Sequence, residues 1–116
     1  MSSLTEIGRS ALDALGKKLE VTANNIANAD TPGFKRSRAI LEEANPAGVV
    51  VSIHKVDSPG VPLPATDPSA AEQESSNVSL EEEIIDLITT KRAFEANTKP
   101  LKAEDEMVGS LLDSLG

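Results

Sequence analysis

The chain has 116 residues, with no cysteine, tryptophan or tyrosine, two phenylalanines and a formal net charge of −8. This length allows one domain, the lack of cysteine excludes disulfides and thiolate chemistry, and no segment is apolar for the roughly 18 residues that a membrane-spanning helix needs. Because aromatic residues are so few, the core has to be built from Leu, Ile, Val and Ala, and we expect a thin core that a partner completes.

Residues 4–29 are predicted to form a first amphipathic helix. Apolar and small side chains recur at steps of about 3.6 residues, the period of a straight helix. Pro32 ends the pattern, because the residue before a proline avoids helical geometry. The stripe consists of Leu4, Ile7, Ala11, Leu15, Leu19, Thr22 and Ile26, with Leu12 beside it.

The middle of the chain is predicted to be irregular, since six of the seven prolines lie between positions 32 and 68. One strand is expected over residues 48–56, with Val49, Val51 and Ile53 on one face. His54, on the opposite face, is expected to point to solvent. Residues 61–78, rich in Pro, Ser, Ala and Glu, are expected to form an extended or mobile linker.

A second helix is predicted from Ser79 onward, where Ser79 and Glu82 fit a capping box. Apolar residues then follow the coiled-coil period of about 3.5 residues. Pro100 predicts a kink or break near residues 97–100, because a proline removes a helical hydrogen bond. The residues at the coiled-coil period form two series along the predicted seam. The first series is apolar throughout: Leu80, Leu87, Phe94, Leu101, Val108 and Leu115. The second series, which alternates with the first, is polar in its middle: Ile84, Lys91, Thr98, Asp105 and Leu112.

The two ends of the chain differ in charge. Residues 1–38 carry six bases and four acids, whereas residues 79–116 carry four bases and nine acids. Ends of opposite sign can pair within one chain or between copies. The acidic balance disfavours general nucleic-acid binding, and we interpret the basic cluster Lys35, Arg36 and Arg38 as a solvated loop.

The residue types that catalysis or metal binding requires do not come together in this sequence. There is a single histidine and no cysteine, the glycines are scattered, and adjacent Glu81, Glu82 and Glu83 do not face one another on a helix. We therefore expect no enzyme, no catalytic residues, no metal site and no cofactor.

Two segments resemble a known family. Residues 19–36, LEVTANNIANADTPGFKR, resemble the N-terminal signature ANN(L/I)AN…TPG(Y/F)KR of bacterial flagellar axial proteins. Residues 76–97, SNVSLEEEIIDLITTKRAFEAN, resemble the matching C-terminal signature. The short middle is most similar to that of the proximal rod protein of the FlgC kind, within the flagellar basal-body rod family.

The resemblance implies a mainly α fold: two long terminal helices in an antiparallel, coiled-coil-like hairpin with a short β or irregular insert. It implies an N-terminal axial helix over residues 1–31, a Pro-rich insert with one short strand or hairpin over 32–78, and a C-terminal axial helix over 79–116. Thr31, Pro32, Gly33 and Phe34 would form the motif turn. Residues expected at subunit interfaces are Leu12, Leu15, Leu19, Asn24, Asn25, Ile26, Asn28, Ile84, Leu87, Ile88, Phe94, Leu101, Val108 and Leu112.

The function that the resemblance implies is that of a structural rod subunit. Such a subunit leaves the cytoplasm through the flagellar type III apparatus and self-assembles through its terminal helices. No cleaved signal is expected, because the first residues lack a basic flank followed by an apolar run. Its partners would be its own copies, other rod and hook–basal-body proteins and the export apparatus, without nucleic acid and without membrane insertion. The alternative is a cytoplasmic helical-hairpin interaction module or regulator that carries the same signatures.

Overall fold

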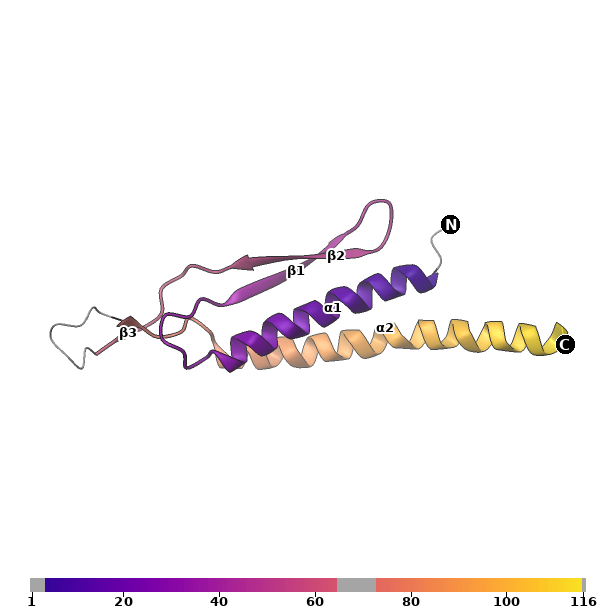
Figure 1. The fold of residues 1–116 in the computed structure, drawn as a ribbon. Helices are drawn as coiled ribbons and strands as arrows, with labels where there is room; N and C mark the ends of the chain where they lie inside the picture. Colours follow the sequence, from indigo (N-terminus) through magenta and orange to yellow (C-terminus); the bar gives the residue numbers. More distant parts are fainter. Residues whose placement is uncertain (1–3, 65–72, 116) are drawn as a thin grey trace.

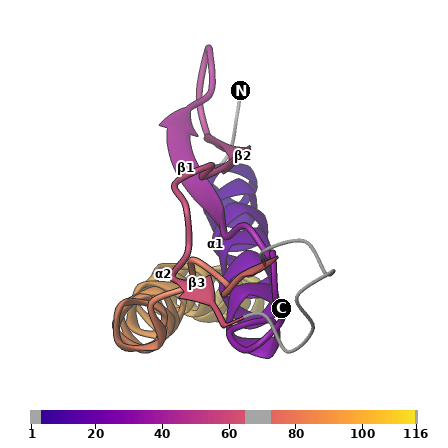
Figure 2. The same ribbon diagram turned by 90° about the vertical axis from the view of Figure 1, so that its left-hand side faces the viewer.

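The computed structural model describes residues 4–64 and 73–115. The elements are helix α1 (Leu4–Ala27), strands β1 (Ser37–Glu43) and β2 (Val49–Lys55), short strands β3 (Pro62–Leu63) and β4 (Gln73–Glu74), and helix α2 (Leu80–Leu115). The two helices lie side by side and antiparallel, and the β1–β2 hairpin packs on another side of α1 (Figures 1 and 2). The result is an elongated molecule of 80 × 25 × 16 Å. The predicted mainly α hairpin with a small β insert is confirmed.

Helix α1 ends at Ala27, two residues before the predicted end, and turns follow it. The amide of Thr31 donates to the carbonyl of Asn28 at 3.1 Å, and that of Phe34 donates to the carbonyl of Thr31 at 3.2 Å. Gly33 has a φ of 75°, which the third position of a type II turn requires and which glycine adopts without strain. Pro32 and Gly33 therefore form the centre of a tight turn.

The insert contains a hairpin, in which β1 pairs antiparallel with β2. β2 lies within the predicted strand, and the pair forms the hairpin that the family resemblance left open. The residues of β1 did not themselves predict a strand, because Ala, Leu and Glu favour helix in isolation. Leu41 and Val51 are cross-strand partners and half-buried. Ile53 lies opposite Ala39 and is 53% exposed, since so small a neighbour leaves it uncovered. His54 is exposed, as predicted.

Two further short strands, β3 and β4, pair antiparallel next to the turn that follows α1. The amide of Gly33 donates to the carbonyl of Glu74 at 2.8 Å, which joins β4 to that turn. The linker predicted over residues 61–78 is thus partly paired, and its segment 65–72 lies outside the described residues.

Helix α2 runs without interruption through Pro100, so the predicted break is wrong, and Figure 1 shows no sharp bend there. Pro100 cannot donate to the carbonyl of Ala96. Both residues are exposed, so water can bind the carbonyl that the helix leaves free.

The predicted capping box at the start of α2 is also wrong. Ser79 does occupy the cap position, since its carbonyl accepts the amide of Glu83 at 3.0 Å. Its hydroxyl, however, lies 3.4 Å from the Glu81 carboxylate, and the Glu82 carboxylate binds Arg36. Glu82 therefore forms an ion pair with Arg36 instead of capping the amide of Ser79.

The core is thin, as predicted. Among the described residues only two apolar side chains, Ala14 and Leu15, are fully buried. The other buried side chains are polar: Thr22, Asn25, Ser76, Glu83 and Thr90. A single copy therefore removes little apolar surface from water, and that surface is the main source of folding energy.

Candidate assembly site

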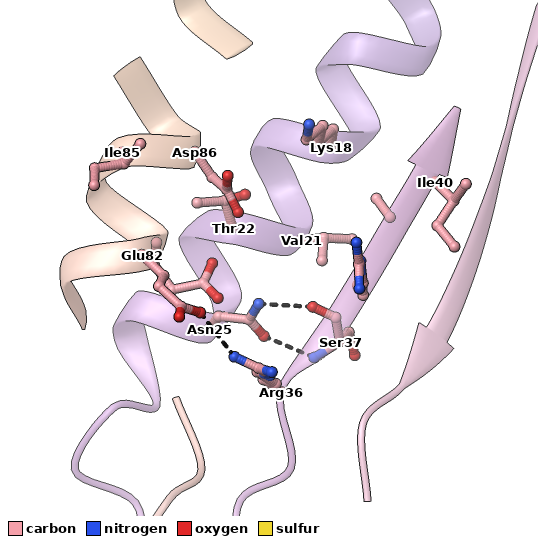
Figure 3. Close-up of a pocket in the computed structure, with 13 residues that line it drawn as sticks. Lys18, Val21, Thr22, Asn25, Arg36, Ser37, Ile40, Glu82, Ile85 and Asp86 are labelled. Atoms are coloured by element: carbon pink, nitrogen blue, oxygen red, sulfur yellow. Dashed lines mark hydrogen bonds and ion pairs between the residues drawn. The ribbon is translucent and has the colours of Figure 1, made fainter. Parts of the chain in front are cut away.

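A buried amide at the end of α1 fixes the start of the hairpin. Asn25 is 1% exposed. Its Nδ2 donates to the carbonyl of Ser37 at 2.8 Å, and its Oδ1 accepts the amide of Ser37 at 3.0 Å (Figure 3). An amide side chain carries both a donor and an acceptor, so one residue satisfies both backbone groups at the beginning of β1.

A second amide, Asn77, ties the same region to α2. Its Oδ1 accepts the amide of Arg36 at 2.7 Å, and its Nδ2 donates to the carbonyls of Val56 and Ser58 at 2.8 and 2.9 Å. The segments before β1, after β2 and before α2 therefore meet at one side chain. The hairpin and the two helices are positioned by polar contacts rather than by an apolar core.

Two ion pairs surround these amides. Lys35 pairs with Glu74 and Arg36 with Glu82, both at 3.1 Å. Both pairs are partly exposed, and such pairs contribute at most about 1 kcal/mol. Two of the three bases that we interpreted as a solvated loop are thus held by this chain's own acids, whereas Arg38 is exposed and its side chain bonds to none of the described residues.

Glu83 is a buried carboxyl on α2, 5% exposed. Burial is the main cause that raises its pKa, and the neighbouring acids Asp86 and Glu82 raise it further. The Asn25 amide and the charge of Arg36 oppose the rise. The site thus holds a carboxyl group whose ionised form is disfavoured in the folded chain.

Three contacts define how α1 and α2 align. The Thr5 hydroxyl donates to the Glu104 carboxylate at 2.7 Å. At Gly8 a Cβ would lie 2.9 Å from the nearest Leu101 methyl group, and at the other end Asn25 neighbours Glu83. These pairs keep one antiparallel register along the whole of α1.

This register corrects half of the predicted seam. The apolar series through Leu87, Phe94 and Leu101 is half-buried, as predicted. In the second series, which alternates with the first, the residues that face α1 lie one position earlier in the sequence than predicted, and the predicted residues face solvent. The second-series residues that face α1 are Glu83, Thr90, Asn97 and Glu104, and the exposed ones are Ile84, Lys91, Thr98 and Asp105.

Thr90 is a seam residue whose side chain lacks a hydrogen bond. It is 1% exposed, and its hydroxyl has no hydrogen-bond partner in the structure. A buried unpaired hydroxyl costs about 1–3 kcal/mol. The intramolecular seam is therefore weak at its centre.

Beyond Glu104 the seam of α2 continues without α1 beside it. Five apolar side chains of this distal part are 49–83% exposed: Met107, Val108, Leu111, Leu112 and Leu115. Their spacing places Val108, Leu111 and Leu115 on the face that packs on α1 lower down the helix. We call this set the distal stripe.

A groove of about 450 Å³ lies in the corner between α1, β1 and α2 (Figure 3). We call it the corner groove. Its lining combines apolar and charged side chains: Lys18, Val21, Thr22, Asn25, Arg36, Ser37, Arg38, Ala39, Ile40, Glu82, Glu83, Ile85 and Asp86.

The residues predicted at subunit interfaces fall into three groups in the single chain. Leu15 and Asn25 are buried within it. The half-buried ones are Leu12, Leu19, Ile26, Asn28, Leu87, Phe94 and Leu101. Five are exposed and free to meet a neighbour: Asn24, Ile84, Ile88, Val108 and Leu112.

The turn motif makes contacts inside the chain. Asn28 donates to the carbonyl of Asn24 at 2.9 Å and accepts the Thr31 hydroxyl at 3.1 Å, so it joins α1 to the turn that contains Pro32 and Gly33. Phe34 is half-buried next to it. Whether copies also bond through these asparagines stays a prediction.

Sequence reasoning gave no role to Asn77, Glu83 or Thr90. Asn77 stands inside the segment that carries the family resemblance, which is the one available signal for it. Glu83 was grouped with Glu81 and Glu82 at the start of a helix, and only the register shows that it faces α1.

No described helix is long and apolar enough to cross a membrane. The described ranges also contain no cluster of three or more acidic or histidine side chains that could hold a metal ion. They do contain a two-helix hairpin whose seam continues beyond α1 as exposed apolar surface, and a groove lined by apolar and charged side chains. Such features are typical of a structural subunit.

Comparison with known families gives this class a name. The model described as "Flagella basal body rod protein" matches residues 6–35, and "Flagellar basal body rod FlgEFG protein C-terminal" matches residues 71–114. Together the two models match well over half of the chain and include nearly all of both helices. The chain belongs to the flagellar basal-body rod protein family, which is a structural family and not an enzyme family.

Two curated relatives agree with this assignment. The flagellar basal-body rod protein FlgG of Buchnera aphidicola subsp. Baizongia pistaciae is 43% identical over 54 residues, which are 47% of this chain and 18% of that protein. FlgG of Buchnera aphidicola subsp. Schizaphis graminum is 49% identical over 37 residues, 32% of this chain and 14% of that protein. The match thus spans less than a fifth of the length of either relative.

Proposed function

We propose that this chain is a structural subunit of the flagellar rod that is exported by the flagellar type III apparatus and self-assembles through α1 and α2. Its neighbours are its own copies and other rod and hook–basal-body proteins. The observation that carries the proposal is the distal stripe, in which Val108, Leu111 and Leu115 continue the α1–α2 seam as exposed apolar surface. Contiguous exposed apolar surface of this kind marks a protein–protein contact.

Export without a cleaved leader is part of the same proposal. The family resemblance of residues 19–36 supports it, and so does the small apolar core. Ala14 and Leu15 are the only fully buried apolar side chains among the described residues, and a subunit with so small a core unfolds at little cost. This property suits passage through a channel in an unfolded state.

The place of the chain within the family is proposed from its insert. Among the described residues, the elements between the two helices are β1 to β4, from Ser37 to Glu74. This short insert supports the proximal rod protein of the FlgC kind. The 54 residues aligned with FlgG cover under a fifth of that longer protein.

Self-assembly is tested by Leu112→Asp. Leu112 is 65% exposed, so the substitution should leave helix content and the melting temperature of the single chain unchanged. In an interface it places an unpaired carboxylate in apolar surroundings. We expect the wild-type protein to form larger species in sedimentation velocity as concentration rises, and Leu112→Asp to remain monomeric.

Ser110→Asp is the matched control, because position 110 lies on the opposite side of α2 from Leu112. It should assemble like the wild type. Assembly of Leu112→Asp at wild-type concentrations would exclude the distal stripe as the contact. A wild-type protein that stays monomeric at every concentration would instead favour the soluble interaction module.

A further inference from the structure

The corner groove is a depression that this chain leaves unfilled. The β1–β2 hairpin packs on α1 and makes no contact with α2. Ile40 and Ile85 line the groove from opposite walls and are 40% and 62% exposed. Val21 at its base is half-buried. An apolar side chain from outside could contact all three elements here.

The groove also carries bases without partners. Lys18 and Arg38 line it, and the side chain of neither forms a hydrogen bond or ion pair with any described residue. On the α2 wall Glu82 is already paired with Arg36, and Glu83 is buried. Two unpaired bases therefore face one exposed unpaired acid, Asp86.

The distal part of α2, residues 104–115, has the complementary character. It carries the distal stripe and four acids, with no base: Glu104, Asp105, Glu106 and Asp113. It begins where α1 begins, since Thr5 binds Glu104, and it is solvent-exposed beyond that point. The groove and the distal part lie near opposite ends of α2, so each copy offers both halves of a possible contact.

We infer that the corner groove of one copy receives the distal part of α2 of a second copy, an inference that rests on the self-assembly proposed above. Leu111 and Leu115 of the incoming helix lie against Ile40 and Ile85, and its acids lie near Lys18 and Arg38. A contact between the distal parts of two copies is disfavoured, because it brings the four acids of each together.

This contact joins two different surfaces, so it leaves one groove and one distal part free at the ends of any chain of copies. Heterologous contacts of this kind form a ring if the rotation between copies closes, and an open filament or helical tube if it does not. The groove thus gives the assembly a polarity.

Because the chain has no cysteine, single-cysteine variants test the inference without background. Ile85→Cys places a thiol in the groove, and Leu111→Cys places one on the distal stripe. Ile88→Cys is the control: it is an exposed isoleucine of the same helix, 48% exposed, that does not line the groove. Leu111→Cys is mixed with either partner at a concentration where the wild type assembles, and the mixture is oxidised mildly.

We expect about tenfold more cross-linked heterodimer with Ile85→Cys than with Ile88→Cys, since a disulfide requires Cα atoms within about 7 Å. Equal yields, or Leu111→Cys linking chiefly to itself, would overturn the groove contact while assembly by sedimentation still supports a rod subunit. Absence of both cross-links and assembly would overturn the groove contact and self-assembly together.

Discussion

At the scale of single residues, amide side chains do the positioning that an apolar core does in larger domains. Asn25 holds both backbone groups of Ser37, and Asn77 holds the backbone at Arg36, Val56 and Ser58. Directional bonds of this kind set a geometry even where little surface is buried. They fix the hairpin on the helices of a subunit whose core is too thin to do so.

Asn25→Ala tests this role. It leaves the amide and carbonyl of Ser37 without their partner, and we expect a loss of about 1–3 kcal/mol in the free energy of unfolding. Asn24→Ala is the control, because Asn24 is exposed and its side chain accepts only a 3.3 Å contact from Asn28; its cost should stay within about 0.5 kcal/mol. Urea unfolding of both variants measures the difference, and equal losses would show that Asn25 does not position β1.

Glu83 gives the chain a pH dependence. Burial raises its pKa in the folded chain, so the folded state binds the proton more tightly than the unfolded state does. The resulting stability is present in mild acid and is lost as the pH rises through the folded-state pKa. Glu83→Gln, which carries no charge, should therefore have a higher melting temperature than the wild type at pH 7 and a similar one near the acid end of the titration.

Glu106→Gln, an exposed change on the distal part of α2, controls for the loss of one negative charge. Its melting temperature should follow that of the wild type at each pH. If Glu83→Gln shows no gain over the wild type at pH 7, the burial of Glu83 does not destabilise the chain.

At the scale of elements, α2 is the helix in which the seam predicted from the sequence differs most from the seam in the structure. The series Leu87, Phe94 and Leu101 could be predicted, because apolar residues at seven-residue spacing have to share a face. The series that alternates with it could not, because Glu83, Thr90, Asn97 and Glu104 are polar, whereas Ile84 beside them is apolar. The pairing with Thr5, Gly8 and Asn25 of α1 sets the register, and no local pattern in α2 reports it.

The hairpin shows the same limit. β2 could be predicted from its run of valines, whereas β1 reads SRAILEE and looks like helix. Its strand geometry comes from pairing with β2 and from the Asn25 contact, which are both tertiary. The two helices and the thin core could be predicted, since they depend on local spacing or on composition, and the turn at Pro32 and Gly33 was expected from the family resemblance.

Pro100 lies inside a continuous α2 and lowers the stability of the helix. Pro100→Ala restores the hydrogen bond to the carbonyl of Ala96, and we expect a gain of about 1–3 kcal/mol in the free energy of unfolding. Lys99→Ala, the exposed neighbour, should change it far less. Thermal unfolding followed by circular dichroism compares them, and an unchanged Pro100→Ala would mean that the free carbonyl is fully satisfied by water.

At the scale of the whole molecule, the chain is thin and elongated and leaves apolar side chains exposed to solvent. It is 80 Å long and 16 Å thick in its narrowest direction, and apolar side chains line both the distal stripe and the corner groove. A lone copy leaves these surfaces in water, and a neighbour that covers them supplies the missing burial. In the contact that we infer between copies, the acidic distal part and the unpaired bases of the groove give the assembly a direction.

The central claim is that this chain is built into the rod, and its recovery in purified hook–basal bodies tests this most directly. Cells that produce the wild type, Leu112→Asp or Ser110→Asp would be fractionated, and the chain would be quantified by mass spectrometry in the basal bodies and in the remaining cell extract. We predict that the wild type and Ser110→Asp are found in basal bodies and that Leu112→Asp is depleted from them. Recovery of the wild type only in the cell extract, from cells whose basal bodies are intact, would contradict the account.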